Sequence, residues 1–337
     1  MRSPSLRGPS LLIALVALVV SVAAAAAIGA VHIPLWSSVF GSEELTALHK
    51  AVLWELRLPR VVLAAVVGVG LAMSGAVLQG LFRNPLAEPQ LIGVSSGAAL
   101  GAIAMIVLGD GLAIPDALLP YAVPLAAIAG ALVVTTALYL IARRIATEGV
   151  AIMLLVGIAI NALAAVGIGL FTWIANDGEL RSLTFWTLGS FGGAEWATVV
   201  PVLLIVLLSV ALLFPLSRDL DALQLGEVEA RHLGVSVPRL RKLVVFCAAS
   251  AVGAGVAVSG MIGFVGLVVP HIARMVGGVH HRMLLPLSAL MGASLMVLAD
   301  LGARTFVTPA EMPVGLLTSA IGAPFFLWLI VRRDRGA

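Results

Sequence analysis

Charged residues are scarce in this sequence. Only 11% of the 337 residues are Asp, Glu, Lys or Arg, whereas hydrophobic residues make up 61%. A soluble globular chain carries about 25% charged residues, so a water-soluble fold is excluded for the main body of the chain. The net charge of +3 comes from basic residues scattered between apolar runs rather than from a basic face. The composition therefore predicts a polytopic membrane protein and gives no indication of nucleic-acid binding.

Cysteine is almost absent as well. The one cysteine, Cys247, lies in an apolar run, which excludes an intrachain disulfide and any cysteine-based metal cluster. A cysteine in such a run is usually packed between helices, and we expect the same here. The sequence also lacks the GxxxxGK(S/T) phosphate-binding motif. If ATP drives this protein, the ATPase is another chain, and we expect this one to hold no cofactor and to be no enzyme.

Apolar runs of about 20 residues, the length that crosses a bilayer, recur along the whole chain. The first resembles a secretory signal peptide, because Arg2 and Arg7 precede it and alanines follow. It continues to Val31 for about 21 residues, which favours a retained span over a cleaved signal. The predicted fold class is all-α, with residues 1–337 forming a single transmembrane domain. The ten predicted spans lie at about 11–31, 60–82, 91–108, 121–142, 150–174, 197–216, 243–260, 261–276, 284–301 and 312–331.

The distribution of Lys and Arg predicts the orientation. With the N-terminus inside, 15 of the 20 basic residues fall in inside segments. Both termini are therefore predicted to be cytoplasmic. Arg57, Arg60 and Arg304 are exceptions, because they lie at the outer ends of spans. Their side chains either snorkel at the membrane interface, with the guanidinium group among the lipid headgroups, or bind an acidic partner protein. The sequence pattern is compatible with both interpretations.

Three polar segments interrupt the apolar pattern. Arg83–Pro89, on the inner side, contains two prolines and an asparagine where a helix cannot easily continue. Ser217–Arg241, also inside, is the longest polar stretch after the first span, and we expect one or two short helices outside the hydrocarbon. Residues 176–187, on the outer side, are expected to form a polar and aromatic loop.

One short motif suggests proteolysis. Gly93-Val94-Ser95-Ser96-Gly97 matches the GxSxG nucleophile elbow, but that elbow needs a strand before it. Here the flanking segments are expected to be membrane helices. Gly97 and Gly101 instead form a GxxxG pattern, which favours close packing between helices.

Two other functions, metal binding and ion-coupled transport, find little support in the sequence. His271 with His280 and His281 could suggest a metal site, but adjacent histidines point apart, and Arg274 and Arg282 would repel a cation. An ion-coupled secondary carrier usually places Asp, Glu or His at mid-membrane. The predicted spans hold almost none, so a pore whose energy comes from elsewhere is favoured, with a secondary carrier as a remote alternative.

Several separated blocks, covering nearly the whole chain, resemble one family. They are Arg57-Leu58-Pro59-Arg60, Arg83-Asn84-Pro85-Leu86-Ala87, Gly93-Val94-Ser95, Trp186-Thr187-Leu188-Gly189-Ser190, Gly260–His271 with Arg274, Asp300 with Arg304, and Glu311–Gly315 with Gly322-Ala323-Pro324-Phe325. With these blocks the chain resembles the FecCD-type permeases of ABC importers, which take up cobalamin, ferric siderophores and heme. The resemblance implies the type II ABC importer permease fold, with ten transmembrane helices per subunit, in a bacterial inner membrane.

The resemblance also implies partners and a gate. It implies a homodimer with the path at the dimer axis, two copies of an ABC ATPase that binds ATP and magnesium, and one periplasmic substrate-binding protein. Asn84 and Leu86 match the cytoplasmic gate of the family. Ala146 and Thr147 lie where a second constriction is found, although Ala146 departs from the polar pair that is usual in the cobalamin permease.

Two contact surfaces follow from the same resemblance. Arg57, Arg60 and Arg304 match arginines that bind acidic residues of the binding protein, and the guanidinium fork suits carboxylates. Residues 217–241 match the coupling helices that seat in the ATPase, where Glu229–Gly234 resembles the EAxxxG pattern. The residues expected to couple to the ATPase are Gly226, Glu229, Ala230, Leu233 and Gly234.

The expected substrate rests on a single stretch of sequence. Residues 80–97 look most like heme permeases, so heme is the expected cargo, with a ferric siderophore or cobalamin as alternatives. The chain is expected to carry out no chemistry on its substrate.

Overall fold

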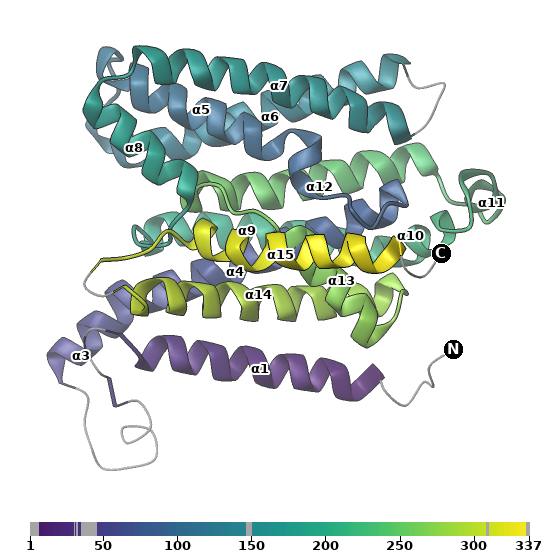
Figure 1. The fold of residues 1–337 in the computed structure, drawn as a ribbon, viewed down its shortest axis with the longest axis horizontal. Coiled ribbons are helices and arrows are strands. Elements are labelled where there is room, and N and C mark those ends of the chain that lie inside the picture. The colour runs from purple at the N-terminus through teal and green to yellow at the C-terminus, as the bar shows by residue number, and fades with distance from the viewer. Residues whose placement is uncertain are drawn as a thin grey trace.

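The computed structural model describes residues 7–29, 31, 33–34, 46–145, 150–307 and 310–334. Within these ranges the chain is helical and contains no β-strand. In the described part of the chain, eight helices are long and apolar enough to cross a membrane, and two shorter apolar helices bring the number to ten. Figure 1 shows these helices lying side by side along one axis.

The ten apolar helices match the ten predicted spans in number and order, which confirms the predicted all-α class. They are α1 (Arg7–Ala27), α4 (Leu58–Phe82), α5 (Val94–Leu108), α6 (Leu119–Ile145), α7 (Val150–Ile174), α9 (Trp196–Leu213), α12 (Val237–Ser259), α13 (Val265–Gly277), α14 (His281–Thr305) and α15 (Val314–Asp334). Single 3-10 turns cover Pro89–Ile92, Gly109–Gly111, Asp116–Leu118 and Phe214–Leu216.

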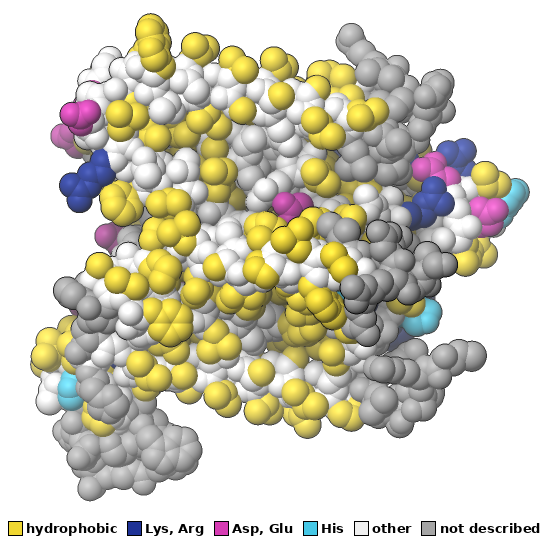
Figure 2. Space-filling view, in the orientation of Figure 1, with side chains coloured by type: hydrophobic (Ala, Val, Ile, Leu, Met, Phe, Trp, Pro, Cys, Tyr) yellow, Lys and Arg dark blue, Asp and Glu magenta, His cyan; other side chains and the backbone are white. Residues whose placement is uncertain are grey.

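Short helices cover the two ends of the bundle. α10 (Ser217–Leu223) and α11 (Glu227–His232) lie at one end, together with the start of α1 and the last turn of α15, and we call this the α10 end (Figure 1). α3 (Ala47–Ala51) and α8 (Asp177–Leu188) lie at the opposite end, which we call the α3 end. In Figure 2 most of the charged side chains in view gather toward these two ends, with hydrophobic side chains between them. This pattern is the one expected of a bundle with an apolar belt.

The outer segment 176–187 was expected to be a loop, and this expectation is wrong. The segment forms α8, because two reciprocal hydrogen bonds cap its N-terminal turn. The Asn176 side chain accepts from the backbone N–H of Glu179 at 3.0 Å, and the Glu179 carboxylate accepts from the backbone N–H of Asn176 at 2.9 Å. Such a capping box satisfies two otherwise unpaired helix N–H groups. α12 also begins earlier than expected, at Val237, where Pro238 suits the first helical turn.

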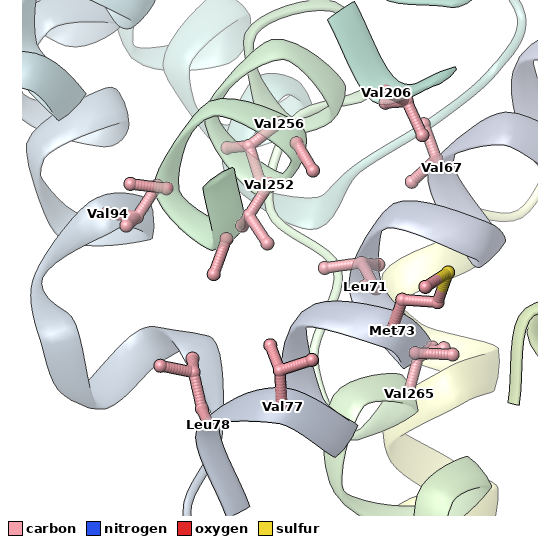
Figure 3. Close-up of a cluster of buried hydrophobic side chains, with 14 of the residues drawn as sticks. Val67, Leu71, Met73, Val77, Leu78, Val94, Val206, Val252, Val256 and Val265 are labelled. Atoms are coloured by element: carbon pink, nitrogen blue, oxygen red, sulfur yellow. The ribbon is translucent and has the colours of Figure 1, made fainter. Parts of the chain in front are cut away.

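The core of the bundle is built around α4. This helix packs against α9, α12, α13 and α14, and nearly all of its residues are buried. Figure 3 shows Val67, Leu71, Met73 and Val77 of α4 meeting valines from neighbouring helices. A helix that is hydrophobic on all sides belongs in the centre of such a bundle.

Glycines set the closest helix contacts. A Cβ on Gly75 of α4 would lie 2.5 Å from the carbonyl carbon of Gly266 in α13, and a Cβ on Gly97 of α5 would lie 2.5 Å from the carbonyl oxygen of Gly130 in α6. Gly101 approaches the backbone of Ala126 in the same way. The predicted close packing through Gly97 and Gly101 is confirmed, and it leaves the GxSxG stretch on a helix rather than after a strand.

Candidate functional site

The chain turns sharply between α4 and α5 at the α10 end. Arg83 adopts the left-handed backbone conformation (φ 49°). The N–H groups of Arg83 and Asn84 donate to the carbonyls of Gly80 (3.3 Å) and Gln79 (3.1 Å) in the last turn of α4, which is a common way to end a helix. The Asn84 side chain then accepts from the N–H of Leu86 at 3.0 Å. The predicted break is therefore a compact, hydrogen-bonded turn.

This turn carries two of the four predicted gate residues. Asn84 and Leu86 are both partly exposed on it. Glu88 follows them, and burial raises the pKa of its carboxyl above the ordinary range. Ala146 and Thr147, the other two predicted gate residues, lie outside the described residues.

Asn161 of α7 is a structural contact of this region that the sequence reasoning missed. Its side-chain amide donates to the carbonyl of Gln90 at 3.1 Å, and its Oδ1 accepts from the Ser96 hydroxyl at 2.6 Å. Asn161 therefore ties α7 to the segment that leads into α5. The signal in the sequence is a lone amide in the middle of an otherwise apolar run. Ser96, which follows the nucleophile position Ser95 of the apparent motif, is thereby used in packing.

A cavity of about 590 Å³ lies beside the turn, walled by the end of α4, by α10 and by the turn between α13 and α14. Arg274 of α13 reaches into this wall and donates to the side-chain oxygen of Gln79. The amide of Gln79 in turn donates to the carbonyl of Gly266 at 3.2 Å. The end of α4 is therefore joined by side chains to α13.

The three histidines weighed as metal ligands do not form one cluster, but His280 and His281 both face the carboxylate of Asp221, so the expectation that adjacent histidines point apart is wrong. The ring of His271 packs edge-on against Phe325, with ring centroids 6.0 Å apart. The ring of His281 lies 2.6 Å from the carboxylate of Asp221 instead, and His280 lies 3.5 Å from the same carboxylate. Asp221 comes from α10, far away in sequence, so its proximity could not be read from local spacing.

At the α3 end the structure brings the three predicted docking arginines together. A cavity of about 390 Å³ is lined by Arg57, Arg60 and Arg304 together with Glu311. Arg60 forms ion pairs with Asp300 (2.8 Å) and with Glu311 (2.9 Å). Asp300 is buried, whereas half of the Glu311 side chain is exposed.

The guanidinium groups of Arg57 and Arg304 are hydrogen-bonded to backbone carbonyls of α1. Arg57 is only 5% exposed and donates to the carbonyls of Ala26 (2.7 Å) and Ala27 (2.8 Å) at the end of α1. Arg304 donates to the carbonyl of Ala25 and lies 3.6 Å from Asp300. These two arginines therefore fasten the end of α1, a role that the sequence did not suggest.

The predicted coupling segment forms α10, α11 and the first turns of α12. Gly226 and Gly234 flank α11 with positive φ angles of 131° and 87°, which favour glycine. Glu227 of α11 pairs with Arg241 of α12 at 2.9 Å, which fixes α11 on the bundle. Ala230 is fully buried inside the chain, so it supports α11 from within, whereas Leu233 is 63% exposed.

An exposed apolar surface surrounds α11. Leu225 and Val228 are 67% and 61% exposed, and together with Leu233 they form what we call the α11 surface. At the right-hand edge of Figure 2, where α11 lies, hydrophobic side chains stand beside acidic and basic ones. Several exposed apolar side chains among polar ones at the end of a membrane bundle are typical of a protein contact. Leu225 and Val228 were missed by the sequence reasoning, because only the EAxxxG-like positions pointed to this segment.

Ten apolar helices within the described residues, polar ends and a centrally buried α4 show that the chain is a multi-span membrane protein. The family model of the FecCD transport family matches residues 14–332, and the chain belongs to that family. Members of the family are membrane permease subunits of ABC importers, in which a partner ATPase supplies hydrolysis.

Individual relatives agree with this assignment. The hemin transport system permease protein HmuU of Yersinia pestis is 49% identical over 278 residues, which cover 82% of each chain. The vitamin B12 import system permease protein BtuC of Escherichia coli is 42% identical over 292 residues, covering 84% of each chain. A solved structure described as an inward-facing conformation of a metal-chelate type ABC transporter superimposes with a TM-score of 0.86 at 34% identity, over 96% of this chain and 98% of that one.

Proposed function

We propose that this chain is the permease subunit of an ATP-driven importer that moves heme from a periplasmic binding protein to the cytoplasm. The 49% identity to a hemin permease, over most of both chains, carries this proposal. The subunit works as a homodimer with two ATPase subunits, which bind ATP and magnesium, and with one binding protein. It lies in a bacterial inner membrane with both termini and the α10 end in the cytoplasm, as the excess of basic residues in the predicted inside segments favours.

The geometry suits alternating access without chemistry on the substrate. In this proposal the arginine-lined cavity at the α3 end receives the binding protein, and the α11 surface receives the ATPase. The turn that carries Asn84 and Leu86 then gates the inner end of the path. A compact turn with defined hydrogen bonds suits a gate, because discrete packed arrangements switch better than a loose loop.

Heme is distinguished from the alternatives by transport. The chain, its ATPase and its binding protein are reconstituted in liposomes, and heme, a ferric siderophore and cobalamin are offered in turn. We expect ATP-dependent entry of heme and entry of the other two at the background level. A complex with a hydrolysis-deficient ATPase is the control.

Cobalamin or siderophore entry without heme entry would overturn the proposed substrate and keep the class. A response to an ion gradient without the ATPase would favour a secondary carrier instead. The BtuC relative at 42% identity is the observation that keeps cobalamin as the second candidate.

Docking of an acidic partner is supported by the cavity at the α3 end. Three guanidinium groups line it, and Asp300 and Glu311 are the only two carboxylates that pair with them among the described residues. Arg60 is the arginine whose partner Glu311 is half exposed and therefore exchangeable. We infer that a carboxylate of the binding protein competes with Glu311 for Arg60.

Glu311→Gln tests this competition without disturbing the buried Arg60–Asp300 pair. We expect the variant to bind its binding protein about fivefold more tightly, because an exposed ion pair is worth up to about 1 kcal/mol. Affinity is measured at several salt concentrations, since the gain should shrink as salt screens the charges. Glu195→Gln is the matched control, because Glu195 is exposed and forms no ion pair within the described part of the chain. Unchanged or weaker affinity for Glu311→Gln would remove Arg60 from the docking surface.

A further inference from the structure

Gly80, in the last turn of α4, is contacted by two side chains from other parts of the bundle. Gln224, just after α10, donates its side-chain amide to the carbonyl of Gly80 at 2.8 Å. The ring of His281, the first residue of α14, packs on the other side of Gly80, where a Cβ would overlap its Nε2. Glycine is therefore required at position 80 by the close approach of an imidazole. The carbonyl of Gly80 also accepts from the N–H of Arg83. Arg83 begins the turn that carries Asn84 and Leu86, which we call the gate turn.

His281 is itself held by α10. Its ring Nδ1 lies 2.6 Å from Oδ1 of Asp221, and its backbone N–H donates to the same oxygen at 2.9 Å. Because an ionised carboxylate only accepts, Nδ1 of His281 carries the proton in this contact. The side chain of His281 is only 2% exposed, so this contact is shielded from water on most sides. Asp221 thus fixes both the ring and the start of α14.

These contacts make a continuous physical connection between two regions. At one end is the α11 surface, which begins at Leu225, directly after Gln224. At the other end is the gate turn, which begins three residues after Gly80. Between them, α10 contacts Gly80 directly through Gln224 and indirectly through Asp221 and His281. Connections of this kind carry coupling when they join rigid elements that move together.

We propose that Asp221, Gln224 and His281 are positioning residues that transmit movement of the α10–α11 segment to the gate turn at Asn84 and Leu86. This inference rests on the proposed function, because it assigns to these residues the step between ATPase movement and gate opening. His281, which Asp221 of α10 holds in place, positions the last turn of α4 from α14, and Gln224 holds the same turn from the end of α10. None of the three touches the substrate in this proposal.

The experiment separates transmission from folding. Asp221→Asn and Gln224→Ala are reconstituted with the ATPase and the binding protein, and substrate entry is measured per ATP hydrolysed. Asp221→Asn replaces a charge-assisted hydrogen bond with a weaker neutral one, and Gln224→Ala removes a hydrogen bond, so we expect this ratio to fall about fivefold or more. We expect the ATPase rate and the amount of copurified ATPase to stay at wild-type values. Asp219→Asn is the matched control, since it removes a carboxylate from the same helix and Asp219 forms no ion pair within the described residues.

A second readout follows the two regions separately. The one cysteine, Cys247, is replaced by Ala so that spin labels can be placed at Arg218 of α10 or at Arg83, which are both exposed and lie outside the α11 surface. In the otherwise wild-type dimer we expect a nonhydrolysable ATP analogue to change the label-to-label distance at both sites. In Asp221→Asn and Gln224→Ala we expect the change at Arg218 to persist and the change at Arg83 to disappear.

The outcomes are distinguishable from failure of the proposed function. If the wild-type complex shows no ATP-dependent entry of any of the three substrates, the proposed function fails. If the wild type transports and both variants keep the wild-type ratio and both distance changes, the transmission role is overturned. If both variants instead lose the ATPase subunit, the three residues serve assembly, which also overturns it.

Discussion

Leu233→Glu is expected to reduce the ATPase that copurifies with this chain by more than tenfold. Leu233 is 63% exposed and directly follows α11, where it forms part of the α11 surface. If this surface fills an apolar groove of the ATPase, the substitution buries a carboxylate without a partner, at a cost of several kcal/mol. A cost of that size exceeds the 1.4 kcal/mol that corresponds to a tenfold change in affinity. The measurement is the ratio of the two subunits after coexpression and affinity purification.

Leu48→Glu is the matched control for this experiment. Leu48 is 61% exposed, similar to Leu233, but lies in α3 at the opposite end of the bundle. We expect it to leave the subunit ratio unchanged. Normal ATPase recovery with Leu233→Glu would show that the α11 surface lies outside the contact, and the coupling role predicted for Leu233 and Gly234 would then fail as well.

The transmembrane helices could be predicted because one requirement, an apolar stretch long enough to cross the bilayer, dominates their sequences. Each span must carry about 20 apolar residues, and the bilayer allows few other solutions. Even α13, which is short and contains Pro270, was found because its neighbours were long and apolar. The ends of the spans were less certain, since α12 continues past the hydrocarbon on a polar segment. The α8 helix was missed because a capping box outweighed the polar composition that suggested a loop.

The parts of the candidate site that could be predicted from the residues are those formed by one continuous segment of the chain. The turn at Asn84 and Leu86 could be placed from its prolines and asparagine. The arginines at the α3 end could be grouped only through the family resemblance, because Arg57 and Arg304 lie far apart in sequence. Their bonds to the carbonyls of α1 depend on how helices pack, and no local pattern encodes such a contact. The same is true of Asp221 and His281, which lie 60 residues apart.

Because Arg57 and Arg60 also hold the fold together, substituting them is a poor test of docking. Charge reversal at Arg57 would place a carboxylate against the carbonyl oxygens of Ala26 and Ala27, and would disturb the end of α1. Loss of Arg60 would leave the buried Asp300 without its closest partner. Either substitution would confuse a folding defect with a docking defect. Glu311, which is exposed and pairs only with Arg60 among the described residues, is the position that separates the two.

Gly75→Ala is expected to lower the thermal midpoint of unfolding by about 4 °C, for a loss of about 3 kcal/mol. The added methyl group would lie 2.5 Å from the carbonyl carbon of Gly266 and 2.6 Å from its Cα. Both atoms belong to the backbone of α13, so no side chain can rotate away, and the two helices must separate. Cys247 supplies the probe, because its thiol is buried and reacts with a fluorogenic maleimide only after the bundle opens.

Gly169→Ala is the matched control, since Gly169 lies in the membrane helix α7 and an added Cβ meets no atom within 4 Å. We expect its midpoint to stay within the error of the wild-type value. The consequence of Gly75→Ala extends beyond stability, because the approach of α4 to α13 also aligns Gln79 with Arg274 beside the gate turn. A folded Gly75→Ala protein should therefore transport less substrate per ATP even below its midpoint. An unchanged midpoint would mean that α4 and α13 separate freely, and a gate that depends on their fixed approach would then be excluded.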